Sequence, residues 1–425
     1  MNAVVQPSFP QPLVTEAFLH DPYPHYEALR AAGPIHWSDE FFGGAWLLVN
    51  HDDVERVLRD PRFSAQRTGG WVMDTLQDTL KDSAQDAESR RELGLFQRLF
   101  ARAMLFMDAP DHTRLRQLLM PAFRPAAMAA LQVEVEQLVD TLIDRIEQGP
   151  ATFDFMTAFA RPLPAQVICR MMGIDAADRG DFIGWSDTLA DFIGAPQPTL
   201  EQARAAHVAL QAMSDYFETI LPAKRRTPGD DLLSVLAVGE ASGQVHGRAE
   251  LLAQSAMLLF AGHETTRNLL GNAVQTLLAQ PGAWAALAAE PALIPAAVRE
   301  VLRHECPVQY TGRRVTTEIE LHGRRLRRGE LVVGLIGAAN RDPARYPDAQ
   351  RFDLSRKAGS SLAFGHGVHL CIGAALTLME GEAALRALVR RWPRLQLQDP
   401  AAAPQWSPNP VYRGLARLTL RRTPE

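Results

Sequence analysis

The sequence is poor in cysteine and has no long apolar run. Its 425 residues include only Cys169, Cys306 and Cys371, too few for a disulfide framework, which favours a reducing compartment. No apolar stretch reaches the roughly 18 residues that a membrane span needs. Residues 1–13 also lack the charged and apolar regions of a signal peptide. We therefore expect a cytoplasmic protein without a membrane anchor.

An excess of charge of one sign is also missing. The chain has 44 Lys and Arg against 49 Asp and Glu, a net charge of −5, which speaks against a nucleic-acid-binding surface. Hydrophobic residues make up 47% and charged residues 22%, as in ordinary globular proteins. Repeats, low-complexity tracts and linkers are absent, so we expect one domain over residues 1–425.

Most of the chain has the apolar periodicity of helices. Apolar residues at three- and four-residue spacing predict helices over 131–146, 200–221 and about 250–280, each bounded by Pro or Gly. The last of these would span roughly 45 Å at 1.5 Å per residue. A mainly α architecture with small sheets fits this pattern better than regular α/β alternation.

Strand-like segments are few and short. Residues 45–49 read as a strand, and residues 415–420 alternate like an edge strand. Residues 319–323 and 331–334 are expected to pair as a hairpin around a turn at 327–329. These predictions place small sheets at the periphery of a helical protein.

One cysteine lies in a segment rich in glycine. The segment reads Phe364-Gly365-His366-Gly367-Val368-His369-Leu370-Cys371-Ile372-Gly373. Glycines allow unusual backbone shapes and close approach of a flat ligand, and loop N–H groups can stabilise a thiolate. A predicted helix begins just after Cys371, and its dipole favours negative charge on the sulfur. Such a thiolate suits a haem iron that cleaves an O–O bond, whereas the plainer alternative is a buried cysteine in a turn.

A second unusual segment interrupts the long predicted helix at its middle. Four polar residues, His263-Glu264-Thr265-Thr266, follow Gly262 within an apolar sequence. Burying a carboxylate and hydroxyls there is costly unless they have partners, and Gly262 weakens the helix by about 1 kcal/mol relative to alanine. A weak turn beside a hydroxyl can open the helix to water. The structural alternative is a polar face turned toward solvent.

The cysteine segment resembles the haem-binding loop of the cytochromes P450 at every fixed position, and weaker similarity extends over nearly the whole chain. The resemblance implies the mainly α cytochrome P450 fold, a triangular helical domain with small peripheral sheets. It implies haem b held by Cys371, with Phe364 packed near the sulfur. It also implies a monooxygenase that inserts one atom of O₂ into an apolar or weakly polar substrate.

The same family resemblance assigns roles to residues around the haem. Glu264 and Thr265 match the acid–alcohol pair that handles protons during oxygen chemistry, while His263 has no assigned role. The segment 108–116 resembles the family's propionate-binding helix, with His112 and Arg116 on one face. His369 matches a further propionate donor, and Arg313 is favoured as another, although Arg314 is an alternative.

The family also carries a structural Glu-x-x-Arg motif. Glu300 and Arg303 match it, and Arg351 is expected to be the third, cationic partner. By itself a Glu–Arg pair at this spacing is a common feature of helix surfaces, worth a few tenths of a kcal/mol. The match therefore gains its meaning from its position about 70 residues before Cys371.

No flavin or iron–sulfur domain is apparent in the sequence. The resemblance therefore implies a monomer that takes electrons from a separate ferredoxin and ferredoxin reductase, docking near Cys371 through arginines such as Arg114 or Arg124. Alternatives are an H₂O₂-dependent peroxygenase of the same fold, a metal site built from His366, His369 and Cys371, and a non-catalytic haem binder. An apolar substrate pocket is expected from residues in three segments: Trp71, Val72, Met73, Leu95, Phe96, Leu99 and Phe100; Phe192, Ile193 and Gly194; Val308, Gln309 and Tyr310.

Overall fold

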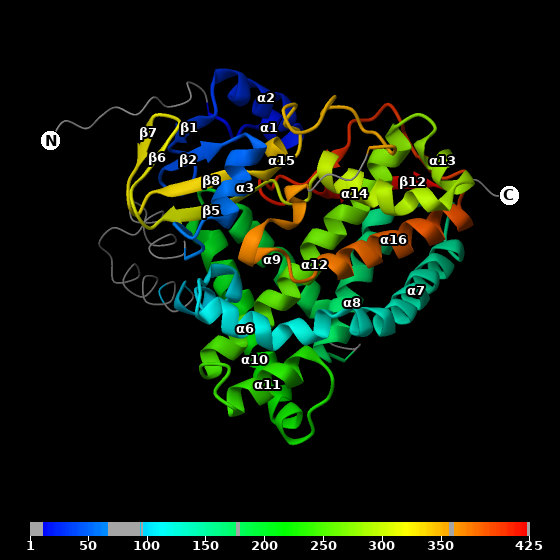
Figure 1. Cartoon of the computed structure of the whole chain (residues 1–425). Helices are drawn as coiled ribbons and strands as arrows, with labels where there is room; N and C mark the ends of the chain where they lie inside the picture. Colours follow the sequence, from blue (N-terminus) through cyan, green and yellow to red (C-terminus); the bar gives the residue numbers. More distant parts are fainter. Residues whose placement is uncertain (1–11, 67–93, 95–96, 176–178, 357–360, 423–425) are drawn as a thin grey trace.

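The computed structural model describes residues 12–66, 94, 97–175, 179–356 and 361–422. Figure 1 shows a roughly triangular outline. The broad side carries the sheets and both chain ends, and the narrow end is formed by α10 (Leu200–Arg226) and α11 (Leu232–Ala241). Within these ranges, no helix combines the length and apolarity required to cross a membrane.

Helices dominate the described residues, and each helix predicted from the sequence is confirmed. The predicted segments lie in α7 (Pro125–Glu147), α10 and α12 (Arg248–Ala279). The remaining α-helices are α1 (Glu16–His20), α2 (Tyr23–Ala32), α3 (His51–Arg59), α6 (Asp111–Leu119), α8 (Pro162–Met172), α9 (Arg179–Gly194), α13 (Ala283–Ala289), α14 (Ile294–His304), α15 (Ile336–Ala339) and α16 (Ala374–Arg391).

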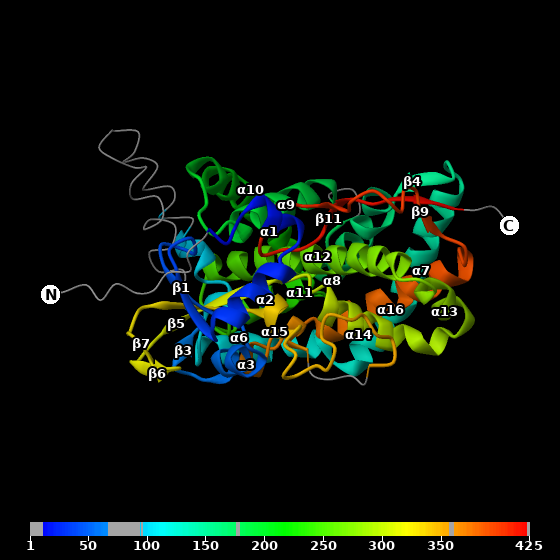
Figure 2. The same cartoon turned by 90° about the horizontal axis from the view of Figure 1, so that it is seen from above.

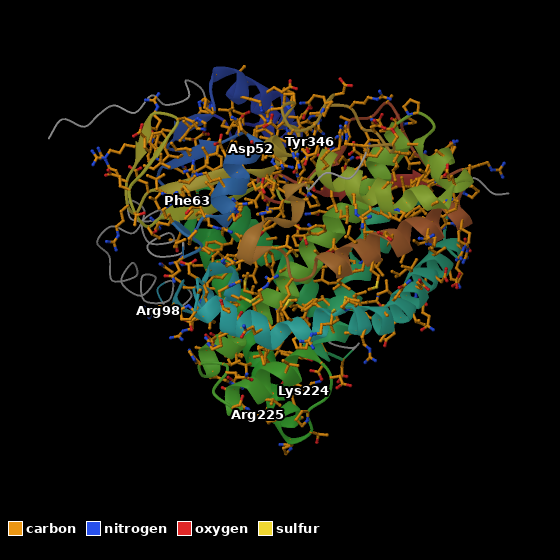
Figure 3. All side chains as sticks on the ribbon, viewed as in Figure 1. Asp52, Phe63, Arg98, Lys224, Arg225 and Tyr346 are labelled. Carbon is orange, nitrogen blue, oxygen red and sulfur yellow. The ribbon has the colours of Figure 1, made fainter. Side chains whose placement is uncertain are left out.

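Ion pairs close the narrow end of the molecule. Lys224 Nζ lies 2.8 Å from the carboxylate of Asp231, the residue that caps α11. Arg225 pairs with Glu240 near the other end of α11. Figure 3 shows Lys224 and Arg225 at this tip. The C-terminal turn of α10 is thereby fixed to both ends of the next helix.

The main sheet has the strand order β1-β2-β8-β5-β3. Its strands are β1 (Ile35–Ser38), β2 (Ala45–Leu48), β3 (Phe63–Ser64), β5 (Tyr310–Val315) and β8 (Leu331–Leu335). Strand β2 confirms the prediction for residues 45–49, and it pairs in parallel with β8. The sheet therefore joins the N-terminal part of the chain to the segment that follows α14.

One strand prediction was wrong in its pairing, and another was right only in part. Strand β6 (Ile319–Leu321) pairs with β7 (Arg324–Leu326) and not with β8. The two-residue turn His322-Gly323 has positive φ at both positions, 49° and 69°, as a tight hairpin requires. Residues 415–420 form two strands, β11 (Leu415–Arg417) and β12 (Thr419–Arg421). Strand β12 is central, between β4 (Thr152–Asp154) and β9 (Gln396–Leu397), whereas β11 pairs only with β10 (Gln405–Trp406) in a two-stranded sheet, so the predicted edge position holds for β11 and not for β12.

The 32-residue helix α12 is the axis of the core. Figure 2 shows it crossing the molecule between α9 and α10 on one side and α14 and α16 on the other, and most of its residues are buried. Gly262 lets α8 pack closely, because a Cβ there would lie 2.8 Å from Ile168 Cδ1. The helix is continuous through Gly262, so the expected opening of this turn is not observed.

A buried ionic cluster anchors α14, and its third partner is not the predicted one. Glu300 and Arg303 form a two-point ion pair with distances of 2.8 and 2.7 Å. The second guanidinium is that of Arg356, whose Nε lies 3.2 Å from Glu300 Oε1. Arg351 contributes only its carbonyl oxygen, which accepts a hydrogen bond from Arg303. The turn after Phe352 brings the later arginine inward, whereas the side chain of Arg351 is exposed.

We expect Arg303→Ala to lower the free energy of unfolding by about 3–5 kcal/mol, because it leaves a buried carboxylate with less compensation. Arg356→Ala should lower the free energy of unfolding by about 1.5–3 kcal/mol, the usual contribution of a hydrogen bond to a charged group. Arg351→Ala is the matched control and should stay within about 0.5 kcal/mol of the parent. Urea unfolding followed by circular dichroism measures all three. Equal losses in Arg351→Ala and Arg356→Ala would contradict this assignment.

Candidate active site

The loop that carries Cys371 has a backbone shape that glycine makes possible. Gly365 and Gly367 have φ values of 73° and 72°, a region that L side chains rarely adopt. The N–H of Cys371 donates to the carbonyl oxygen of Phe364 at 2.9 Å and closes the loop. Helix α16 begins three residues after Cys371. The loop therefore presents the sulfur immediately before a helix N-terminus, as the sequence predicts.

The side chain of Cys371 faces an internal cavity. Cys371 is exposed and lines this cavity, whereas Cys169 and Cys306 are buried in the core. Burial raises the pKa of the Cys371 thiol, and the backbone N–H of Gly373 and the charge of Arg116 offset part of that rise. These are the groups that stabilise a negatively charged sulfur.

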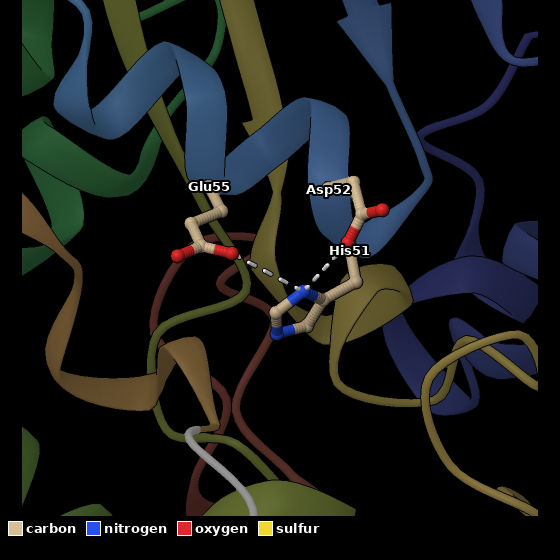
Figure 4. Close-up of side chains that lie close together, drawn as sticks. All are labelled: His51, Asp52 and Glu55. Atoms are coloured by element: carbon tan, nitrogen blue, oxygen red, sulfur yellow. Dashed lines mark ion pairs between the residues drawn. The ribbon is translucent and has the colours of Figure 1, made fainter.

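Helix α3 supports the same loop from outside the cavity. A Cβ at Gly367 would lie 3.0 Å from the carbonyl oxygen of Leu58, so the loop packs directly on the helix backbone. His366 Nε2 lies 3.4 Å from Glu55. Figure 4 shows the other contacts of this cluster, in which His51 Nδ1 lies 3.6 Å from Asp52 and 3.8 Å from Glu55. His366 thus contacts α3 through Glu55, and it also lines the cavity with Cys371.

Helix α12 forms part of the wall of the cavity that Cys371 lines. Ala261 and Thr265, one turn apart, both line it, and the hydroxyl of Thr265 donates to the Ala261 carbonyl oxygen at 3.2 Å. Thr266 points elsewhere: its hydroxyl lies 3.3 Å from that of Thr377 on α16. The two threonines therefore have different surroundings, and Thr265 alone of the pair faces the cavity.

Glu264 is buried and does not line the cavity among the described residues. Its Oε1 lies 2.6 Å from Arg267 Nη2 and accepts from Asn268 at 3.0 Å. Arg267 also donates to Asp187 on α9 at 2.6 Å. Burial raises the pKa of Glu264, and Arg267 offsets only part of the rise because it shares its charge with Asp187. This carboxylate is therefore easier to protonate than an ordinary glutamate.

Cationic groups converge on one edge of the cavity. His112 and Arg116 from α6, Arg313 from β5 and His369 from the cysteine loop all line it. The rings of His112 and His369 lie 4.0 Å apart between centroids. Burial and the neighbouring Arg116 and Arg313 lower the pKa of His112. The positive charges of Arg116 and Arg313 at this edge indicate a site that would accept an anionic ligand.

The structure separates the two arginines that the sequence left as alternatives. Successive side chains of a strand point to opposite faces of a sheet. Arg313 is buried and lines the cavity beside His112, while Arg314 lines a second cavity of about 790 Å³. Both cavities include Thr265 and Cys371, so they meet at α12.

Part of the predicted substrate pocket is present in the second cavity. Ile193, Val308 and Tyr310 line it, whereas Phe100, Phe192 and Gln309 are buried in the core, and Leu99 and Gly194 do not line it. Trp71, Val72, Met73, Leu95 and Phe96 lie outside the described residues. Leu105, at the end of the segment expected to set the substrate, also lines this cavity, whereas Phe106, Phe260, Val411 and Tyr412 were not predicted. These residues reach the cavity through the packing of segments that are distant in the sequence, and local sequence patterns do not predict such packing.

The comparisons with known proteins agree with this geometry. Residues 73–407 match the family model described as Cytochrome P450. Cytochrome P450 107B1 of Saccharopolyspora erythraea is 38% identical over 411 residues, 96% of each chain. The cytochrome P450 monooxygenase PikC of Streptomyces venezuelae is 37% identical over 408 residues, 95% of this chain and 92% of that protein. The chain belongs to the cytochrome P450 family.

A solved structure supports the same conclusion. P450BioI, crystallised in complex with hexadec-9Z-enoic acid ligated acyl carrier protein, matches with a TM-score of 0.84 at 31% identity, covering 96% of this chain and 100% of that one. The cytochrome P450 fold predicted from the sequence is confirmed. The protein is an oxidoreductase of the haem-thiolate monooxygenase class, which uses O₂ and a redox partner. The cavity fits such a group, since it offers one sulfur ligand, a cationic edge and apolar walls.

Proposed function

We propose that this protein is a haem-b-dependent monooxygenase that inserts one atom of O₂ into an apolar or weakly polar organic substrate. The reaction converts substrate, O₂, two electrons and two protons into hydroxylated product and water. Its main support is that Cys371 and Thr265, which match the family's haem ligand and proton-handling alcohol, both line one cavity. When bound, the haem supplies the electron-transfer and oxygen chemistry, and a thiolate ligand favours O–O cleavage.

Cys371 is the proposed metal ligand, and Phe364 lines the cavity beside it. His112, Arg116, Arg313 and His369 are the proposed partners of the two haem propionates, since a carboxylate would pair with the positive charges at the cationic edge of the cavity. Arg313 is preferred to Arg314 because it lies on the same side of β5 as this cationic edge.

We expect Arg313→Ala or Arg116→Ala to speed haem loss, because each removes a charged hydrogen bond worth about 1.5–3 kcal/mol, roughly 10- to 100-fold in retention. Arg314→Ala is the neighbouring control and should leave the rate unchanged. Haem transfer to apomyoglobin measures this rate. If Arg314→Ala accelerates the loss and Arg313→Ala does not, the two assignments must be exchanged.

Thr265 and Glu264 are the proposed proton-handling pair. The Thr265 hydroxyl is positioned to donate into the cavity once it leaves the Ala261 carbonyl oxygen. Glu264 lies behind it, with its pKa raised by burial, and Arg267 connects it to the partly exposed Asp187. We infer that protons pass from the side of Asp187 to Glu264 and then to the cavity.

Thr265→Ala should keep consuming reductant at a comparable rate while producing peroxide in place of product, because the hydroxyl serves proton delivery and not electron supply. Glu264→Gln should slow the whole cycle, since proton supply then becomes limiting. Thr266→Ala is the control and should do neither, because its hydroxyl faces Thr377. The assay is the ratio of product to reductant consumed, with peroxide measured in parallel. Tight coupling in Thr265→Ala would remove this residue from proton delivery.

A ferredoxin with its reductase is the proposed electron source, and the protein is proposed to act as a monomer with residues 1–425 forming one unit. Val368 in the cysteine loop is exposed and does not line the cavity, which suits a docking surface. Arg114 is unsuited to docking because Glu250 and Asp111 hold its guanidinium at 2.8 and 2.9 Å. Arg124 is exposed and stays in the proposal.

The experiment that tests the proposed function is the carbon monoxide complex of the reduced protein. The parent should show the red-shifted Soret band of a thiolate-ligated haem, and Cys371→Ser should lose it while keeping its circular dichroism. Survival of the band in Cys371→Ser would exclude this cysteine as the ligand. Product formation with O₂, reductase and ferredoxin, but not with H₂O₂ alone, distinguishes a monooxygenase from a peroxygenase.

A further inference from the structure

The cavity of about 790 Å³ extends from α12 to the outer end of the main sheet. Its inner part includes Thr265, Phe260 and Tyr412, and its outer part includes the turn between β7 and β8. Strand β5 runs between these parts, and its four residue steps from Tyr310 to Arg314 cover about 13 Å at the usual rise per residue. The cavity is therefore long enough for an extended molecule.

The charge in this cavity is confined to its outer part. Arg314, Arg327, Arg328 and Glu330 are its charged residues among the described lining residues, three positive and one negative. Arg314 donates to the carbonyl oxygen of Gly329 at 2.5 Å, which fixes it beside the turn. The local charge is thus positive, although the chain as a whole carries −5.

The single carboxylate does not neutralise these arginines. Glu330 Oε2 accepts from Trp46 Nε1 at 2.8 Å and from the backbone N–H of Arg327 at 2.9 Å. Within the described residues, the guanidinium groups of Arg327 and Arg328 have no hydrogen bond or ion pair. An arginine fork binds a carboxylate through two parallel hydrogen bonds. Two such forks are therefore available at the outer end of an otherwise apolar cavity.

We propose that the substrate is an amphiphile whose carboxylate binds Arg327 and Arg328 while its apolar body extends inward to Thr265. This inference rests on the proposed monooxygenase function and specifies its substrate class. It also specifies the position of oxidation. Because the carboxylate stays at the outer end, the carbon atoms that reach Thr265 and Cys371 are those remote from the head group.

The test uses the haem-loaded protein with dodecanoate and dodecanol, both below their micellar concentrations. Binding is measured by the Soret shift. The double variant Arg327→Gln/Arg328→Gln should weaken dodecanoate binding about three- to twentyfold, the expected range for two exposed ion pairs, and should leave dodecanol affinity unchanged. Rising ionic strength should reduce the preference for dodecanoate, because exposed charges are screened.

The matched control is Arg324→Gln/Arg325→Gln on the same hairpin. It removes the same charge, but neither residue lines the cavity, and Arg325 pairs with Glu318 at 2.6 Å. It should leave both affinities unchanged. Oxidised dodecanoate should carry its hydroxyl in the half of the chain remote from the carboxylate.

Equal weakening by both double variants, no weakening by either, or oxidation beside the carboxylate would overturn the inference. The proposed function has a separate readout: it fails if the Cys371-dependent carbon monoxide band is absent. A parent that shows this band and oxidises dodecanol, but does not prefer dodecanoate, overturns the substrate class alone.

Discussion

The position of the cysteine loop depends on a buried ion pair more than 60 residues earlier in the chain. Arg303, held by Glu300, donates to the carbonyl oxygen of Asn340 at 3.0 Å. The side chain of Asn340, fully buried, accepts from the N–H of Leu362 at 2.7 Å. Leu362 begins the turn that leads into the loop. The ionic cluster on α14 therefore fixes where the loop begins, and the glycines then decide its shape.

The acidic residue of α12 shows how burial and charge sharing set chemistry. A carboxylate with a guanidinium of its own would be strongly acidic. Arg267 lies between Glu264 and Asp187, 2.6 Å from each, so neither carboxylate has a full positive charge to itself. Glu264 Oε2 has no hydrogen-bond partner among the described residues. Burial therefore raises the pKa of Glu264 even though Arg267 lies beside it, so this carboxylate takes up a proton more readily than one in an isolated ion pair.

Local sequence patterns predicted helices and the cysteine loop well. They predicted poorly which strands pair and which arginine joins the ionic cluster. The loop around Cys371 and the helix α12 were predictable because glycine placement and apolar periodicity act within a few residues. The strand that pairs with β6 was predicted wrongly. The expected hairpin turned at residues 327–329, but the two-residue turn His322-Gly323 forms a tighter hairpin, because both of its residues adopt positive φ. Arg351 was expected as the third partner of the ionic cluster, and Arg356 went unnoticed, because sequence spacing does not reveal which side chain a turn directs inward. The roles proposed for the haem-facing residues stay predictions.

Under the two proposals made above, strand β5 would contribute one arginine to haem binding and the next to substrate binding. Its register with β8 places Arg313 opposite Val332 and Arg314 opposite Leu331. Because adjacent side chains point to opposite faces, one arginine joins the cationic edge near His112 and the other joins the outer cavity. Two cationic sites can therefore lie close together without competing for the same anion. A one-residue slip of β5 would exchange the two arginines between the two cavities, so the pairing with β8 would constrain both proposed binding sites together.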